Sequence, residues 1–230
     1  MSSPQPESVT ISLPDAQRVS GLLQVPAQAR ACYVLAHGAG AGMAHPFLAA
    51  IADGLAECGV ATLRYQFLYM EQGSRRPDVP KVAHAAVRAA VAEAARRLPD
   101  VPLFAGGKSF GGRMTSQAQA VGPMAGVRGL AFLGFPLHPP DKPSNERAKH
   151  LFEVGIPMLF LQGTRDEFAQ LELLEPLGRE LGARATLKFF PDADHSFHVP
   201  ARSGRKDPEV RAELLDAMVE WMGRIAARGS

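Results

Sequence analysis

The sequence predicts an α/β fold, a mainly parallel, twisted β-sheet with helices on both faces, in a single domain spanning residues 1–230. Short apolar runs alternate along the chain with segments of helical periodicity, which is typical of β-α-β units. Several runs are apolar throughout, as expected for strands buried on both faces. The 230 residues suit one such domain, and no internal repeat or interdomain linker interrupts them.

The first elements are an antiparallel hairpin and a buried strand. Residues 9–13 and 19–25 are β-like and flank the turn-rich segment Pro14-Asp15-Ala16-Gln17. Residues 32–36 form a continuous apolar run that ends in H-G-A-G-A-G, from residue 37. A helix is expected over residues 46–58 and another strand over 61–67.

A loop and a long helix follow. Residues 68–80 are polar and contain Gly and Pro, which favours a loop. Residues 81–98 have apolar side chains on one helical face, and Pro99 ends this helix.

Residues 103–112, L-F-A-G-G-K-S-F-G-G, predict a strand, a tight turn with Ser109 at its apex, and a helix from about Gly111 to Val121. Residues 107–111 match G-x-S-x-G, the nucleophile elbow. The glycines fit because side chains beside Ser109 would collide with the neighbouring strand and helix. The turn exposes the Ser109 hydroxyl and points the N–H of Phe110 at a developing oxyanion.

Two nucleotide-binding alternatives fail on spacing. Gly107-Lys108-Ser109 resembles the end of a phosphate-binding loop, but that pattern needs a glycine where Pro102 stands. The segment from His37 resembles a dinucleotide-binding loop, but its last glycine position holds Met43.

The remaining chain continues the alternation. Strands are expected over residues 129–133, 158–161 and 186–190, and helices over 145–154 and 170–181. The last helix begins at Pro208 with Asp207 as its N-cap. Its apolar stripe comprises Val210, Leu214, Met218, Trp221 and Ile225. The connection over residues 136–145 is too short for a large lid.

Two further candidate catalytic residues follow strands. Asp166 lies just past the strand over 158–161, and His195 just past the strand over 186–190. Because ligands bind at the carboxyl ends of parallel strands, both residues should lie beside Ser109. The order Ser109, Asp166, His195 is the order that a nucleophile-elbow fold uses.

The expected roles follow from acid–base chemistry. His195 would remove the proton of Ser109, and Asp166 would orient the imidazole and stabilise its charged form. The second oxyanion donor, beside the N–H of Phe110, is expected to be the N–H of Ala39.

Each residue has a plainer interpretation. Taken singly, Asp166 could be a turn aspartate and His195 a solvated loop histidine. Nearby alternatives for the acid and base are Asp192, Asp194, Glu167 and His198. Tyr69 and His138, in loops at the same edge, would contact substrate or lie on the surface. The roles of Lys108, Arg113 and Cys32 are open.

Composition narrows the class of protein. The 25 basic and 23 acidic residues give a net charge of +2, which offers no argument for a nucleic-acid partner or a membrane surface. No secretion signal or apolar run long enough to span a membrane is visible. Cys32 and Cys58 are expected to be reduced and buried, so a cytoplasmic location is the default. No metal or cofactor is predicted.

Three strings give a resemblance to the α/β-hydrolase superfamily. They are A-G-G-K-S-F-G-G-R (residues 105–113), F-L-G-F-P-L-H-P-P (132–140) and L-F-L-Q-G-T-R-D (159–166). The chain resembles small α/β-hydrolases often labelled dienelactone-hydrolase-like, whose relatives include a subunit of the nonspecific-lethal chromatin complex. The resemblance implies a triad at Ser109, Asp166 and His195. Dienelactone hydrolases use a cysteine nucleophile, so Ser109 argues against a lactone substrate.

The expected function is that of a cofactor-independent serine hydrolase. It would cleave a carboxylic ester or thioester with a small or exposed acyl group, through an acyl-enzyme, on a small-molecule substrate. The alternative is a binding or scaffold protein that retains the fold with little turnover. The physiological substrate and the oligomeric state do not follow from the sequence.

Overall fold

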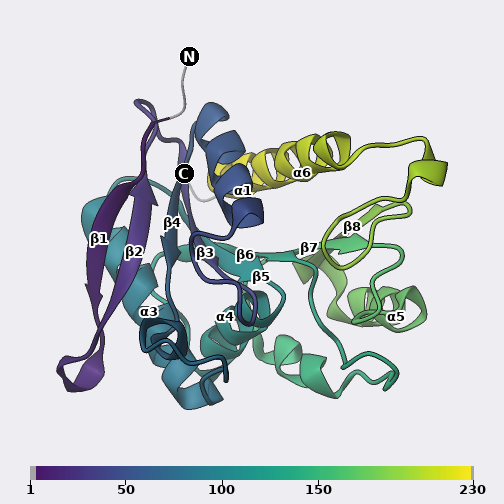
Figure 1. Ribbon diagram of the computed structural model, residues 1–230, viewed down its shortest axis with the longest axis horizontal. Coiled ribbons are helices and arrows are strands. Elements are labelled where there is room, and N and C mark those ends of the chain that lie inside the picture. Colours follow the sequence, from purple (N-terminus) through teal and green to yellow (C-terminus); the bar gives the residue numbers. More distant parts are fainter. Residues whose placement is uncertain (1–3, 229–230) are drawn as a thin grey trace.

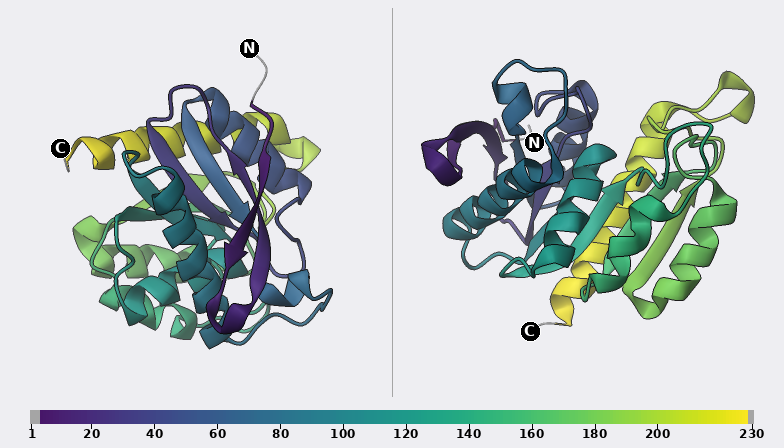
Figure 2. Two further views of the ribbon diagram at one scale, coloured as in Figure 1. Left: turned by 90° about the vertical axis from the view of Figure 1, so that its left-hand side faces the viewer. Right: turned by 90° about the horizontal axis from the view of Figure 1, so that it is seen from below.

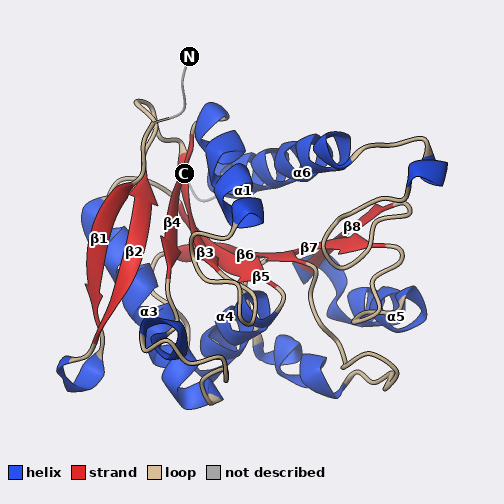
Figure 3. Cartoon of the chain, in the orientation of Figure 1, coloured by secondary structure: helices blue, strands red, loops and turns tan. Residues whose placement is uncertain are grey.

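The computed structural model describes residues 4–228, so residues 1–3 and 229–230 of the expected domain lie outside the described residues. The strands of the described chain form one sheet in the order β1-β2-β4-β3-β5-β6-β7-β8, which crosses the molecule in Figure 1 and Figure 3. Their bounds are β1 Glu7–Ser12, β2 Arg18–Gln24, β3 Ala31–Ala36, β4 Val60–Tyr65, β5 Leu103–Lys108, β6 Val127–Leu133, β7 Met158–Gly163 and β8 Ala185–Phe190.

The sheet is mainly parallel, as the sequence predicts. The pairs β1–β2 and β2–β4 are antiparallel, and every pair from β4 through β3 to β8 is parallel. The hairpin β1–β2 therefore forms one edge of the sheet (Figure 2, left), and β8 forms the other. The strands β3, β4 and β7 are buried over their whole length because helices cover both faces.

Two groups of helices cover the two faces. The helices α1 (Pro46–Glu57) and α6 (Asp207–Ala227) pack on one face, and α3 (Pro80–Arg97), α4 (Phe110–Val121) and α5 (Leu171–Leu181) pack on the other (Figure 1). Each face has its own apolar cluster. On α6, four residues of the expected stripe are fully buried, and Ile225 packs against them partly buried. This fold, with no large lid between β6 and β7, matches the prediction.

The predicted loop over residues 68–80 contains a short helix, α2 (Leu68–Glu71). Leu68 and Tyr69 are buried against the core, so this segment is anchored to the fold. The predicted helix over residues 145–154 is a 3₁₀ helix, η2 (Glu146–Glu153). Its buried residues, Ala148 and Leu151, and the buried Val154 that follows it are three positions apart, which is the period of a 3₁₀ helix.

The start of α6 also differs from the prediction. Lys206, and not Asp207, is its N-cap. The Lys206 N–H donates to the Glu209 carboxylate over 3.0 Å. The Asp207 carboxylate accepts from the Val199 N–H instead and pairs with exposed His198. Asp207 therefore ties the preceding loop to the helix.

The two cysteines differ in burial. Cys32 is fully buried in β3, and burial raises the pKa of its thiol to about 12. Cys58 follows α1 and is partly exposed, so the expectation that both are buried holds for Cys32 only. Within residues 4–228, no helix is long and apolar enough to cross a membrane.

Candidate active site

Ser109 joins β5 to α4 at a sharp turn. Its backbone has φ 51° and ψ −116°, a sparsely populated conformation for a residue with a side chain. The turn lies close to the end of β3. A Cβ atom at Gly107 would lie 2.3 Å from the Ala36 carbonyl oxygen, and one at Gly111 would lie 2.5 Å from that of His37. Glycine is therefore required on both sides of Ser109, as the sequence predicts.

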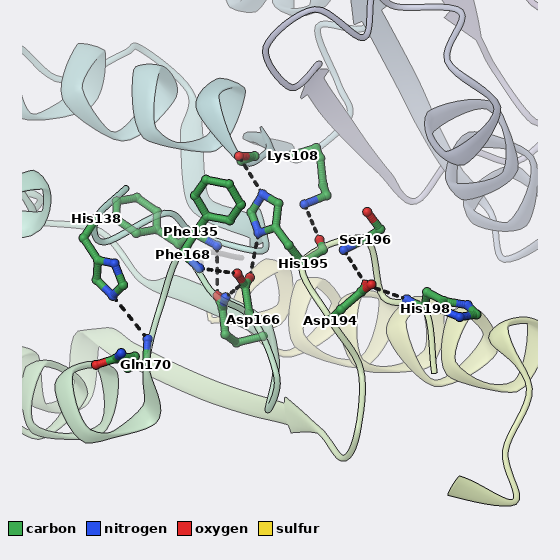
Figure 4. A network of polar contacts seen from close by, with 12 residues as sticks. Lys108, Phe135, His138, Asp166, Phe168, Gln170, Asp194, His195, Ser196 and His198 are labelled. Atoms are coloured by element: carbon green, nitrogen blue, oxygen red, sulfur yellow. Dashed lines mark hydrogen bonds and ion pairs between the residues drawn. The ribbon is translucent and has the colours of Figure 1, made fainter. Parts of the chain in front are cut away.

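His195 lies between Ser109 and Asp166. Its Nδ1 is 2.7 Å from Asp166 Oδ2 (Figure 4). Its Nε2 is 2.8 Å from the Ser109 hydroxyl oxygen. An ionised carboxylate only accepts hydrogen bonds, so Nδ1 carries the imidazole hydrogen. Nε2 then presents a lone pair to the Ser109 hydroxyl. The loops after β5, β7 and β8 thus bring the three expected residues into one hydrogen-bonded line.

The Asp166 side chain is buried and fully hydrogen-bonded. Oδ1 accepts from the Phe168 N–H over 2.8 Å, and Oδ2 accepts from Gln162 Nε2 as well as from His195. Gln162 is itself oriented, because its Oε1 accepts from the Phe135 N–H over 2.9 Å. Sequence reasoning missed Gln162, although a buried glutamine at the end of an apolar strand was a visible signal.

The loop that carries His195 is organised by Asp194. Asp194 Oδ1 accepts from the N–H groups of Ser196 (2.8 Å) and His198 (3.0 Å) (Figure 4). The Phe168 ring packs against the imidazole with 4.4 Å between ring centroids. His195 is therefore held by both its backbone and its ring.

The nearby alternatives are not joined to Ser109. Asp192 donates its backbone N–H to the Thr164 hydroxyl, and the Glu167 side chain is exposed. His198 pairs with Asp207, and that hydrogen bond raises the pKa of His198 above its usual value.

A cavity of about 330 Å³ opens beside Ser109 and His195. Ala39 lines one side of it, and Phe47 and Phe168 supply apolar wall. A small substrate group placed here would meet the hydroxyl and the imidazole together.

The loop after β3 is fixed by side chains from α2 and from the segment that joins β4 to α2. The Gly40 N–H donates to the Tyr69 hydroxyl over 2.9 Å, and the Met43 N–H donates to Gln66 Oε1 over 2.8 Å. The Ala39 N–H takes part in no hydrogen bond with other described residues. Phe110 is the first residue of α4, where the N–H has no partner within the helix. Neither expected oxyanion donor is therefore used in a backbone hydrogen bond among the described residues.

Tyr69 and His138 are structural, and both expectations for them are wrong. Each is buried, and neither lines the cavity. The Tyr69 ring packs near His37, Phe67 and Phe110. His138 lies with Nδ1 2.8 Å from the Pro139 carbonyl oxygen.

His37, the first residue after β3, is buried and neutral. Its Nε2 accepts from the Phe67 N–H over 3.1 Å, so Nδ1 carries the hydrogen and donates to the Gly38 carbonyl over 2.7 Å. Burial lowers the pKa of His37 to about 4. Its role is to orient the loop. In the described part of the chain, no group of three or more His, Cys, Asp or Glu side chains is placed to hold a metal ion.

Solved structures with the same fold include two that are named as hydrolases and a protein called Est1E. A dienelactone hydrolase from Anabaena variabilis is 21% identical, with a TM-score of 0.78 over 96% of this chain and 98% of its own. An α/β serine hydrolase without a lid from Xanthomonas campestris is 20% identical, with a TM-score of 0.74 over 94% and 95%. Est1E from Butyrivibrio proteoclasticus is 17% identical, with a TM-score of 0.70 over 96% and 99%.

None of these three names refers to a chromatin complex, so that part of the expected kinship stays a prediction. A family model described as an alpha/beta hydrolase domain matches residues 29–223, which is most of the chain. With this match, the eight-stranded sheet and the similar solved structures, the chain belongs to the α/β-hydrolase superfamily.

Proposed function

We propose that this hydrolase cleaves a carboxylic ester or thioester through an acyl-enzyme, with Ser109 as nucleophile, His195 as general base and acid, and Asp166 as the group that orients His195. The N–H groups of Ala39 and Phe110 form the proposed oxyanion hole. A single domain would carry the whole site. The observation that carries the proposal is the line of hydrogen bonds from Ser109 through His195 to Asp166 at the edge of a cavity.

In the acylation step, Ser109 Oγ attacks the carbonyl carbon of the substrate while His195 Nε2 takes the hydroxyl proton. The carbonyl oxygen becomes an oxyanion and accepts hydrogen bonds from the two backbone N–H groups. His195 then gives the proton to the leaving alkoxide or thiolate as the bond to the carbonyl carbon breaks. The product is the acyl ester of Ser109 and a free alcohol or thiol.

In the deacylation step, water takes the place of the leaving group. His195 removes a proton from the water, whose oxygen attacks the acyl carbon, and the same two N–H groups hold the second oxyanion. The proton then returns to Ser109 Oγ as the carboxylic acid leaves. The Asp166 carboxylate stabilises the imidazolium in both steps, and no cofactor is needed.

The size of the cavity supports a small acyl group. The segment over residues 68–80 is anchored by Tyr69 and does not line the cavity, so it supplies no long apolar wall. Each CH₂ of an acyl chain gains only about 0.8 kcal/mol when it is buried against an apolar protein surface. We therefore propose acyl groups of about two to six carbons, with kcat/KM for p-nitrophenyl esters highest in this range. A steady rise to ten or more carbons, about the length of a medium-chain fatty acid, would contradict this.

Active-site labelling tests the proposed function. A fluorophosphonate probe should modify Ser109 alone, and Ser109→Ala should abolish both the labelling and the hydrolysis of p-nitrophenyl acetate. Ser116→Ala is the matched control, because Ser116 also lies in the α4 region and contacts a histidine but is fully buried. Labelling that persists in Ser109→Ala would show that Ser109 is not the nucleophile. A wild-type protein that is neither labelled nor active would favour the scaffold alternative.

A further inference from the structure

Lys108, the residue before the proposed nucleophile, contacts the proposed base. Its Nζ donates a hydrogen bond to the backbone carbonyl oxygen of His195 over 2.6 Å (Figure 4). The bond joins the carboxyl end of β5, a central strand, to the loop after β8, the last strand in the order of the sheet. Lys108 is thus covalently attached to Ser109 and hydrogen-bonded to His195, the two residues whose separation decides proton transfer.

The lysine ammonium also lies beside the other polar groups of the site. A Cβ atom built on Gly134 would lie 3.0 Å from Lys108 Nζ, 3.3 Å from His195 Nδ1 and 3.4 Å from Asp166 Oδ2. The three groups therefore converge on one small space above Gly134, which only a residue without a side chain leaves open. The ammonium therefore lies near both the Asp166 carboxylate and the His195 imidazole.

The rest of the Lys108 side chain is partly buried and lines the cavity beside Ser109. Its Cγ would lie 3.6 Å from a Cβ atom at Gly38, and Nζ lies 5.7 Å from the centroid of the Phe197 ring. Phe197 has φ 62°, so the loop that contains His195 makes a tight turn here. These contacts accompany the hydrogen bond from Nζ to the His195 carbonyl.

We propose that Lys108 is a positioning residue for catalysis: its ammonium group holds the His195 backbone so that Nε2 stays within hydrogen-bond distance of the Ser109 hydroxyl. This inference rests on the proposed function of the same site. Asp194 and Phe168 hold the loop after β8, but in the described sheet no further strand lies beyond β8 to support it. A charge-assisted bond to its backbone supplies that support, because such bonds are roughly twice as strong as neutral ones.

The charge of Lys108 is sensitive to pH near neutrality. Burial lowers the pKa of Lys108 to about 8, against the smaller opposing effects of Asp166 and Asp194. The titratable groups that face it are these two carboxylates and His195. The ammonium form is present below this pKa and is lost above it. Activity should therefore fall on the alkaline side as the bond to the His195 carbonyl loses its charge.

The test compares Lys108→Met with wild type. Loss of the ammonium should lower kcat for p-nitrophenyl acetate by roughly 10- to 100-fold, an effect in the range of other losses of positioning. KM should stay within about twofold because Nζ is hydrogen-bonded to the His195 carbonyl, although the Lys108 side chain lines part of the cavity. The alkaline decline of kcat near the Lys108 pKa should disappear. Lys81→Met, which removes an exposed lysine at the start of α3, is the matched control.

Chemical rescue separates positioning from folding. Lys108→Cys in a Cys58→Ser background leaves one reactive thiol, because Cys32 is fully buried. Alkylation with 2-bromoethylamine restores an ammonium of nearly the same length, with a sulfur in the chain. Activity should return, and the alkaline limb should move to lower pH because the sulfur makes the amine less basic.

Three outcomes would overturn the proposal. The Lys108→Met variant could keep the kcat and pH profile of wild type, or aminoethylation could fail to restore activity. A change in KM alone would make Lys108 a substrate-binding residue. The wild-type protein gives a test without any variant, since its rate of fluorophosphonate labelling should decline above about pH 8. Absence of labelling at Ser109 at every pH would refute the proposed function instead.

Discussion

The molecule contains two serine–histidine pairs of nearly the same length. Ser109 Oγ lies 2.8 Å from His195 Nε2, and Ser116 Oγ lies 2.7 Å from His150 Nε2. Both serines lie in or next to α4, about two helical turns apart. Distance alone therefore does not distinguish a candidate catalytic pair from a structural one.

The direction of the hydrogen bond differs between the pairs. Ser116 donates its only hydrogen to the Arg113 carbonyl over 2.9 Å, so His150 must donate from Nε2 to Ser116. In the other pair, Asp166 accepts a hydrogen bond from His195 Nδ1–H, and Nε2 is left to accept from Ser109. Of these two histidines, only His195 is in the tautomer that can remove a serine proton.

The surroundings differ as well. Burial lowers the pKa of His150 to about 4, and the positive charges of Arg113 and of protonated His84 act in the same direction. Among residues 4–228, the ion pairs include none to His150. Ser116 is fully buried within a regular helix, whereas Ser109 lines a cavity. A carboxylate behind the histidine and access to a ligand are what set the two pairs apart.

The largest expected difference between the pairs is in turnover. His195→Ala should lower kcat for p-nitrophenyl acetate by about 10⁴-fold, as loss of a general base does in other triads. His150→Ala, like His198→Ala, should leave kcat within about threefold, since neither histidine contacts the nucleophile or orients the base. Steady-state kinetics on the purified variants decide this. A larger loss from His150→Ala or His198→Ala would reverse the assignment of the base.

Asp166→Asn tests whether the tautomer is the deciding feature. The amide can donate a hydrogen to His195 Nδ1, which would move the imidazole hydrogen to Nε2 and give His195 the state that His150 has. We expect kcat to fall by roughly 10³- to 10⁴-fold with little loss of stability. The rate of fluorophosphonate labelling should fall in parallel. A variant with near wild-type activity would show that the tautomer is not what separates the pairs.

The pH dependence of stability tests the environment of His150. The pKa of His150 is about 4 in the folded protein, against 6.5 for an unperturbed histidine. Its contribution to the free energy of unfolding is therefore present above pH 6.5 and is lost as the pH falls toward 4. For this partly exposed group we expect roughly 2 kcal/mol. His150→Gln should therefore show a smaller drop in the free energy of unfolding between pH 7 and pH 4.5, measured in urea. If the free energy of unfolding fell as much as in wild type, other groups such as His37 would account for the pH dependence.

The smallest effect is expected from Ser116→Ala. The change removes the acceptor for the His150 N–H and should lower the free energy of unfolding by about 1–2 kcal/mol. Hydrolysis and probe labelling should be unchanged. Urea unfolding together with an esterase assay measures both, and the reverse pattern would mean that Ser116 takes part in the reaction.

The fold and the three residues of the hydrogen-bonded line were predictable because they follow from position along the backbone. Parallel strands bring their carboxyl ends to one edge, so Asp166 and His195 had to lie near Ser109. The destination of a long side chain does not follow in this way. Nothing in the sequence pattern showed that Lys108 reaches His195.

The same limit explains the other misses. Tyr69 lies in a segment whose composition is typical of a loop, yet its ring is buried and its hydroxyl binds the Gly40 N–H. The 3₁₀ geometry of η2 depends on contacts that bury every third residue, and those contacts form only in the folded protein. Tertiary packing decided each of these features.

The turn at Ser109 has a consequence for the stability of this protein. A serine held at φ 51° and ψ −116° costs the folded state about 1–3 kcal/mol, a cost that glycine at the same position would not bear. Ser109→Gly should therefore be inactive yet melt at a higher temperature than wild type. The strained turn would thus lower stability in order to present the hydroxyl, a trade-off of the kind seen where a site needs a strained residue.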